Sequence, residues 1–406
     1  MSPSERFREL LRIPTVSGTS ANDGTYHKAA ALLASWMRVI GLQNIQTIEF
    51  VAGKPVVFGS RIGSDASLPS ILLNGHYDVV PVSDPSAWSV DPFAAAARSD
   101  GRIVARGAQD MKCVAVQYLE ALRELKRLGH LPARSIHVSL MPDEEVGGLD
   151  GAARFVQSEI FSKLNVGLAL DEGLANPGNA FSVFYGERAS NWVILRTRGP
   201  TGHGSRFIKN TAIERMTEIL TRIYSHRKEL ACQCHQTSLG DVLSMNVTAM
   251  RAGVPSSALR GGFAVNVIPS EAEIAIDIRV PLHVHDVEQI IRDHWIKNIP
   301  DVEIEYADKN THPDPTLLTE PVENDPWIAK ISEEIRRCIP GIDVSLEVFP
   351  AGTDGRHIRH AGVPCIGFSP IRNTPILLHD NDEYVAESGF LEGIDVYVAL
   401  LKRLAF

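Results

Sequence analysis

The 406-residue sequence lacks any apolar run of the roughly 18 residues that a membrane-spanning helix needs, so we expect no membrane partner. Residues 1–17 carry charges where a signal peptide would have an apolar core. Cysteine is scarce as well: the five cysteines are odd in number and scattered, which argues against a disulfide framework. We therefore expect a protein of the reducing cytoplasm.

Basic runs are also missing from the chain. It has 40 Lys and Arg against 49 Asp and Glu, a net charge of -9, whereas nucleic-acid binding requires a positive surface. We therefore expect no nucleic-acid partner. Cys232 and Cys234 have no second Cys/His pair at zinc-finger spacing, and we interpret them as structural residues.

The sequence does contain enough apolar material for a sizeable core. Hydrophobic residues make up 44% of the chain and charged residues 22%, as in soluble globular proteins. A chain of 406 residues exceeds one ordinary domain, so we expect two. Near the start, Ser4 is a candidate N-cap of a short amphipathic helix with Phe7, Leu10 and Leu11 on one face.

Strand and helix patterns alternate over residues 1–187. Apolar residues at helical spacing predict helices over 26–41 and 111–129, and runs of apolar residues predict strands near 70–76, 135–142 and 166–170. This alternation is typical of an α/β domain with a mostly parallel sheet, which binds its ligands at the C-terminal ends of the strands.

The order of elements changes between residues 188 and 310. Strands are predicted over 190–199, 243–253, 272–280 and 302–307, with helices over 211–230 and 286–297. The resulting β-α-β-β-α-β order predicts a small ferredoxin-like domain. The larger pattern then resumes over 311–406. We therefore expect a discontinuous catalytic α/β domain, 1–187 with 311–406, interrupted by an inserted domain at 188–310.

Histidines and carboxylates recur at the predicted ends of strands and helices. Taken singly, each has a structural explanation, such as helix capping or a solvated loop. Together, at one edge of an α/β sheet, they would repel one another without a cation, so we interpret them as metal ligands. The stretches are "NGHYDVVP" (His76, Asp78), "ARGAQDMK" (Asp110), "PDEEVGG" (Glu144, Glu145), "ALDEG" (Asp171, Glu172) and "LLHDNDE" (His379, Asp380).

Carboxylates outnumber imidazoles in this set, and no thiolate belongs to it. Such a set suits zinc, cobalt or manganese in a catalytic site, and one bridging carboxylate would hold two ions about 3.5–4 Å apart. A glycosidase with paired carboxylates is an alternative, against which the two histidines argue. On the residues alone, either Asp171 or Glu172 serves as the ligand of its stretch.

Eight stretches resemble the binuclear zinc exopeptidase/deacylase family that includes acetylornithine deacetylase and carboxypeptidase G2. The resemblance covers essentially the whole chain, with its motifs in the family's order. Three of them, "RGAQDMKCV", "FYGERAS" and "LDEGLANP", favour the aminoacylase branch. The stretches are "LLNGHYDVVPV", "ARGAQDMKCVAVQYLEALRELK", "MPDEEVGG", "ALDEGLANP", "GPTGHGSRF", "GGFAVNVIP", "AGTDGRHIR" and "GFSPIRNTPILLHDNDE".

The resemblance implies two zinc ions per subunit. His76, Asp110 and Glu172 would hold one, and Asp110, Glu145 and His379 the other, with Asp110 bridging. It also implies that the Asp110–Met111 peptide bond is cis. The expected activity is hydrolysis of N-acyl-L-amino acids to a carboxylate and a free L-amino acid.

The resemblance also implies roles outside the ligand set. Glu144 would be the general base and acid, and Asp78 would orient the imidazole of His76. The family is homodimeric, with the inserted domain serving in dimerisation and as a lid, and His203 would cross to the partner's active site to stabilise the oxyanion. Asn266, Arg279 and Arg356 would bind substrate, Arg356 through the substrate carboxylate.

The sequence departs from the family pattern at two places. Residues 251–262 form a longer connection before Asn266, and His357 stands where aminoacylases commonly have an aromatic residue. Both departures bear on acyl or side-chain preference. The alternatives are a dipeptidase or an acetylornithine-type deacetylase on the same scaffold and, in another class, a non-catalytic binding homologue.

Overall fold

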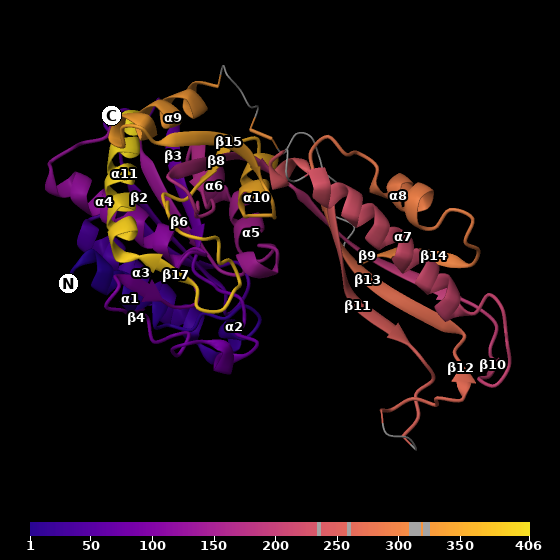
Figure 1. Cartoon of the computed structure of the whole chain (residues 1–406). Helices are drawn as coiled ribbons and strands as arrows, with labels where there is room; N and C mark the ends of the chain where they lie inside the picture. Colours follow the sequence, from indigo (N-terminus) through magenta and orange to yellow (C-terminus); the bar gives the residue numbers. More distant parts are fainter. Residues whose placement is uncertain (234–236, 258–260, 308–317, 320–324) are drawn as a thin grey trace. The chain divides into compact units, whose positions relative to one another are not determined.

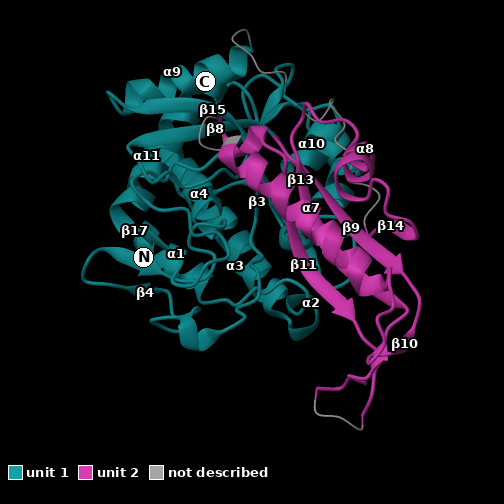
Figure 2. Ribbon diagram, turned by 45° about the vertical axis from the view of Figure 1, so that its right-hand side comes forward, with its two compact units in different colours: residues 1–186, 316–349, 353–406 teal, residues 187–315, 350–352 magenta. Residues whose placement is uncertain are grey.

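The computed structural model describes residues 1–233, 237–257, 261–307, 318–319 and 325–406. The chain divides into two compact units (Figure 2): unit 1 is residues 1–186, 316–349 and 353–406, and unit 2 is residues 187–315 and 350–352. The first segment of unit 1 ends at residue 186, one residue before the predicted boundary at 187. The boundary predicted after residue 310 lies outside the described residues, and so does Cys234. Residues 350–352 belong to unit 2, which the sequence pattern did not indicate.

Unit 1 is built around an eight-stranded sheet in the order β1-β2-β6-β3-β7-β16-β8-β15 (Figure 1). The four neighbours β6, β3, β7 and β16 are parallel, whereas β1, β2 and β8 pair in antiparallel fashion. The expected α/β sheet is thus parallel at its centre. The strands are β1 Gln43–Glu49, β2 Pro55–Arg61, β3 Ser70–His76, β6 Ile136–Met141, β7 Val166–Asp171, β8 Ala180–Glu187, β15 Asp343–Phe349 and β16 Cys365–Phe368.

Helices cover both faces of this sheet, and the central strands are apolar on both sides for that reason. In β3, Ile71 and Leu73 pack into the core on one face, and Leu72 packs into a second core on the other. All three are fully buried, which stabilises the fold by roughly 1.5–3 kcal/mol per side chain. The first face is covered by α1 Pro3–Leu11, α3 Thr25–Ile40, α4 Lys112–Arg127, α9 Pro326–Cys338 and α11 Glu387–Ala405, and the second by α5 Ala152–Val156, α6 Glu159–Ser162 and α10 Gly355–His360 (Figure 1).

The N-terminal helix begins earlier than expected. Ser2, not Ser4, is the N-cap of α1: its hydroxyl accepts a hydrogen bond from the Glu5 amide, and the Glu5 side chain accepts one from the Ser2 amide. Pro3 fits the first helical position because it has no N–H to satisfy. The expectation of Ser4 as the cap was therefore wrong, and Ser4 is buried within the helix.

Short elements complete unit 1. A three-stranded sheet has the order β17-β5-β4. Separately, no helix in the described part of the chain is long and apolar enough to cross a membrane. The short elements are β4 Ala96–Ala97, β5 Arg102–Val104, β17 Tyr384–Ala386, the helix α2 Ser20–Asp23 and the single turns η1 Pro85–Ala87 and η2 Glu144–Val146.

Unit 2 contains an antiparallel sheet in the order β11-β13-β9-β14, the ferredoxin-like arrangement that was expected. One face of the sheet packs on the helices of unit 2 through a core of its own, which includes Leu195, Ile219 and Ile276. The helix expected over 286–297 is instead a short α-helix followed by a π-helical turn. The elements are β9 Ala189–Arg198, β10 Gly202–His203, α7 Ala212–Gln233, η3 Leu239–Asp241, β11 Ser244–Ala252, β12 Val267–Ile268, β13 Glu271–Val280, α8 Val287–Ile290, η4 Ile291–Trp295 and β14 Val302–Tyr306.

Candidate metal centre

The predicted ligands of unit 1 gather at the C-terminal edge of its parallel strands. β6, β3 and β7 are adjacent, and they end at Met141, His76 and Asp171 respectively. Because parallel strands end at the same edge, residues that follow them in sequence lie close together there. Asp110 lies two residues before the start of α4 at Lys112, and the bond that joins it to Met111 is cis. The cis bond implied by the family resemblance is therefore present.

One group of possible ligands contains His76, Asp110 and Glu172. Each offers one ligand atom, and these atoms all lie within 4.8 Å of one another. The Nε2 atom of His76 is 3.1 Å from Oδ1 of Asp110 and 3.6 Å from Oε2 of Glu172. All three residues are buried, so a cation bound between them would be largely shielded from water.

A second group contains Asp110, Glu145 and His379, again with ligand atoms within 4.8 Å of one another. Nε2 of His379 is 3.3 Å from Oδ2 of Asp110 and 3.0 Å from Oε2 of Glu145. His379 is exposed, unlike His76, so this group borders solvent. Asp110 faces one histidine with each carboxylate oxygen, which is the arrangement that a bridging ligand requires.

Burial and mutual repulsion dominate the electrostatics of these carboxylates. Burial and the facing Glu172 raise the pKa of Glu144 well above its ordinary value, and burial and Asp110 raise the pKa of Glu172 in the same way. Burial and Asp110 raise the pKa of Glu145 to about 7. The repulsion that the sequence indicated is thus visible as carboxyl groups that resist ionisation.

The histidines, in contrast, favour their charged form, because they face carboxylates. Burial by itself would lower the pKa of His76, but Glu172 and Asp110 raise it well above the ordinary value. Hydrogen bonds to Asp110 and Glu145 raise the pKa of His379 to about 10. Burial opposes ionisation of Asp110, yet the bonds from His379 and His76 lower its pKa below the ordinary value.

This donor set fits two divalent cations. Imidazole nitrogens and carboxylate oxygens are the ligands that catalytic zinc sites use, and the two groups share one carboxylate. Among the described residues, no Lys or Arg forms an ion pair with Asp110, Glu144, Glu145 or Glu172. Two divalent cations would balance the charge of these carboxylates in their ionised form.

Asp78 holds the turn that carries Glu144 and Glu145. It is fully buried, and its two carboxylate oxygens accept hydrogen bonds from the Glu144 and Glu145 amides, both at 3.2 Å, and from the Ser17 hydroxyl at 2.7 Å. Its Oδ1 is also 3.3 Å from Nδ1 of His76. The residue expected to orient His76 therefore also anchors the turn.

Asp143, the first acid of "DEE", points to different partners. Its carboxylate forms an ion pair with Lys54 and accepts a hydrogen bond from the Tyr26 hydroxyl at 2.7 Å. Its backbone is in the left-handed region, at φ 62°. The three consecutive acids therefore separate: Asp143 binds a lysine, while Glu144 and Glu145 face the histidines.

The contacts of Asp171 differ from those of Glu172. Oδ1 of Asp171 accepts a hydrogen bond from the side-chain Nδ2 of Asn74 at 3.1 Å. The side-chain oxygen of Asn74 in turn accepts one from the Ser139 hydroxyl. Glu172, not Asp171, is grouped with His76 and Asp110. Asp171 is therefore held against the neighbouring strands.

Glu383 is a residue of the site that the sequence analysis missed. It is fully buried and accepts hydrogen bonds from the amides of Gly107, Gln109 and Asp110, and from the Arg106 guanidinium at 2.8 Å. It thereby fixes the loop that delivers Asp110. Its place in "HDNDE", close to His379, was the one signal in the sequence that could have indicated its role. The groups that donate hydrogen bonds to it are more than 270 residues away in sequence.

Arg356, predicted to bind substrate, lies at the start of α10 beside the same turn. Its Nη2 donates a hydrogen bond to the Gly147 carbonyl at 2.8 Å, and the neighbouring His357 approaches the same oxygen at 3.1 Å through Nε2. Burial and Arg356 lower the pKa of His357 to about 4. The imidazole is therefore neutral at pH 7, and its Nε2–H tautomer donates to the carbonyl.

Three further predicted residues belong to unit 2. His203 in β10 pairs with Val267 in β12, and the Gly204 amide donates to the Asn266 carbonyl at 2.7 Å, so His203 and Asn266 are neighbours. Arg279 binds Asp277 on its own strand and donates to the Ser190 hydroxyl at 2.7 Å.

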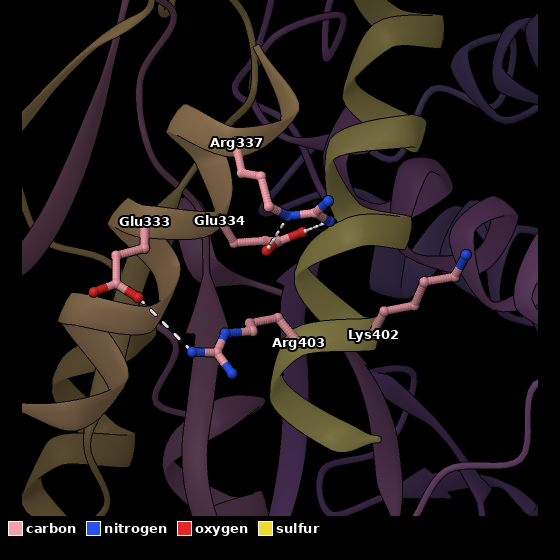
Figure 3. Close-up of a pocket in the computed structure, with 5 residues that line it drawn as sticks. All are labelled: Glu333, Glu334, Arg337, Lys402 and Arg403. Atoms are coloured by element: carbon pink, nitrogen blue, oxygen red, sulfur yellow. Dashed lines mark hydrogen bonds and ion pairs between the residues drawn. The ribbon is translucent and has the colours of Figure 1, made fainter. Parts of the chain in front are cut away.

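A surface hollow of about 450 Å³ lies elsewhere in unit 1, between α9 and α11 (Figure 3). Its lining contains two ion pairs, Glu334 with Arg337 and Glu333 with Arg403. None of the predicted site residues lines it, and four of its five charged lining residues already form ion pairs with one another. The lining residues are Glu333, Glu334, Arg337, Lys402 and Arg403.

Known proteins resemble the chain over nearly its whole length. A model of peptidase family M20/M25/M40 matches residues 72–403. Aminoacylase-1 of Sus scrofa is 42% identical over 404 residues, covering 98% of this chain and 94% of that protein. Aminoacylase-1 of Dictyostelium discoideum is 40% identical over 414 residues, covering 98% and 96%. The structure of the M20 family metallo-carboxypeptidase Sso-CP2 from Sulfolobus solfataricus matches with a TM-score of 0.74 and 18% identity over 99% of both chains.

Proposed function

Because the chain belongs to peptidase family M20/M25/M40, we propose that it is a metal-dependent amidohydrolase that cleaves N-acyl-L-amino acids to a carboxylate and a free L-amino acid. The similarity to aminoacylase-1 supports this substrate class. The observation that carries the proposal is the convergence of two ligand groups on Asp110, with the buried Glu144 beside them.

In this proposal His76, Asp110 and Glu172 hold one zinc ion, and Asp110, Glu145 and His379 hold the other. Zinc ions, when bound, lower the pKa of water and polarise the acyl carbonyl. Asp78 keeps the His76 ring in place through Nδ1, so that Nε2 faces the ligand group.

Glu144 is the proton carrier of the reaction. Its Oε2 lies 3.9 Å from Nε2 of His76, next to the ligands but outside both ligand groups. Its carboxylate takes a proton from the attacking water and passes it to the departing amine. Burial and Glu172 raise the pKa of Glu144 well above its ordinary value, which makes its carboxylate a stronger base toward the attacking water than an ordinary glutamate.

Substrate recognition is assigned to the remaining predicted residues. Arg356 would bind the substrate carboxylate through its planar guanidinium. Asn266 and Arg279 would contact substrate, and His203 would stabilise the oxyanion in the partner of a homodimer. The enzyme would act in the cytoplasm.

A substrate panel with metal control tests the function. We expect the zinc-loaded protein to hydrolyse N-acetyl-L-methionine faster than N-acetyl-L-ornithine or simple dipeptides, and exhaustive chelation to abolish the reaction. Preference for N-acetyl-ornithine or dipeptides would establish one of the alternatives on this scaffold. Metal binding without hydrolysis of any panel member would favour the binding homologue, and activity that survives chelation would contradict the metal-dependent reaction.

A further inference from the structure

The turn that carries Glu144 and Glu145 has little apolar anchoring. The neighbouring Val146 and Leu149 are 56% and 60% exposed. The turn is closed by three backbone hydrogen bonds: the Gly147 amide donates to the Glu144 carbonyl at 2.8 Å, and the Gly148 and Val146 amides donate to the Asp143 carbonyl at 2.8 and 3.3 Å. Gly147 lies at φ 106°, and because it has no side chain its backbone can adopt many other conformations. Hydrogen bonds from outside therefore determine where the turn lies.

On its C-terminal side, the Ala153 amide donates to the Gly148 carbonyl at 3.0 Å, and two side-chain donors converge on the Gly147 carbonyl oxygen. Arg356 Nη2 and His357 Nε2 lie 2.8 and 3.1 Å from it. A carbonyl oxygen has two lone pairs, so the two donors satisfy it fully. The His357 ring also packs against Gly148, where an added Cβ would lie 3.2 Å from Nε2.

We propose that His357 is a positioning residue for the Glu144–Glu145 turn, because its ring N–H holds the Gly147 carbonyl when Arg356 turns to the substrate. This inference rests on the proposed function in one respect, the assignment of Arg356 to the substrate carboxylate. We take Arg356 to release the Gly147 carbonyl when its guanidinium pairs with the substrate carboxylate. His357 remains as the hydrogen-bond donor that holds Glu144 and Glu145 in position during the reaction.

The test compares three single variants of the zinc-loaded, full-length protein. His357→Phe keeps a ring of similar size but removes the donor, His357→Gln keeps a donor near the Nε2 position, and His360→Phe makes the same change at the exposed histidine of the same helix. We expect His357→Phe to lower kcat about ten- to hundredfold with KM changed less than about threefold, because small misplacements of catalytic groups slow the chemical step. His357→Gln should restore most of kcat, and His360→Phe should match wild type.

Hydrogen exchange of peptides covering residues 143–150 gives a readout that does not depend on catalysis. We expect several-fold faster exchange in His357→Phe and wild-type exchange in the other two variants. If wild type fails to hydrolyse N-acetyl-L-methionine, the proposed function fails, while the exchange data still test the positioning. Wild-type kcat and exchange in His357→Phe, or equal damage in His357→Gln, would overturn the inference. His357→Ala replaces His357→Phe if the latter is insoluble.

Discussion

Acidic side chains gather in both units, with opposite consequences. In unit 2, Glu271, Glu273, Glu303 and Glu305 surround Arg196 on the sheet, and Arg196 lies 2.8 Å from Glu273 and 3.4–3.5 Å from the other three. In unit 1, the described ion-pair partners of the site carboxylates Asp110, Glu144, Glu145 and Glu172 are histidines.

The difference shows what distinguishes a metal site from an acidic surface. In unit 2 the chain supplies its own cation, and water screens glutamates that are 23–52% exposed. In unit 1 burial removes that screening and raises the pKa of Glu144, Glu145 and Glu172. An acidic cluster therefore indicates a cation site when it is buried and lacks an arginine.

The largest expected effect separates two adjacent members of the buried cluster. Glu144→Gln should lower kcat by about 10²–10⁴-fold and leave bound zinc near the wild-type content, because Glu144 carries a proton and lies outside both ligand groups. Glu145→Gln should weaken zinc binding itself. Elemental analysis of the purified variants measures this, and equal zinc loss in both would contradict the division of roles.

A buried histidine with no carboxylate among its described partners, His137, tests the comparison further. Burial lowers the pKa of His137 to about 4, in contrast to His76, which lies one strand away. The unfolded chain takes up this proton near pH 6.5, and the folded chain near 4, so the contribution of His137 to stability is complete above 6.5 and is lost as the pH falls to 4. The loss is about 3 kcal/mol.

Denaturant unfolding of metal-free wild type and His137→Gln between pH 7 and 4 measures this contribution. We expect the free energy of unfolding of wild type to fall more steeply, since the glutamine side chain of the variant takes up no proton in this range. Because both samples are free of metal, zinc loss does not contribute to the slopes. Parallel slopes would show that burial does not control the protonation of His137.

The smallest effect is expected in unit 2. Arg196→Ala should change the melting temperature by no more than about 3 °C and leave zinc content unchanged, because partly exposed ion pairs contribute little. Scanning calorimetry at low and high salt measures it. A large drop in melting temperature would mean that the exposed cluster is a stability centre like a buried one.

Much of the candidate site was predictable because strand ends are visible in sequence. Apolar runs located the ends of β3, β6 and β7, and polar residues at or just after those ends, such as His76 and Glu172, do lie together. The inserted β-α-β-β-α-β unit was predictable for a similar reason, since its strands alternate in polarity.

Contacts between segments distant in sequence were not predictable. No local pattern records that Lys54 is the partner of Asp143. The same holds for Glu383 as the acceptor of the Gly107, Gln109 and Asp110 amides. The π-helical turn at 291–295 was likewise invisible, because its apolar spacing also suits an α-helix.

Zinc titration of the metal-free protein by calorimetry tests the central claim, that the buried carboxylates and histidines hold two cations through a shared Asp110. The account predicts about two zinc ions per wild-type chain and weakened binding at both positions in Asp110→Asn, because Asp110 belongs to both ligand groups. Unchanged zinc binding in Asp110→Asn, or no stoichiometric binding in wild type, would contradict it.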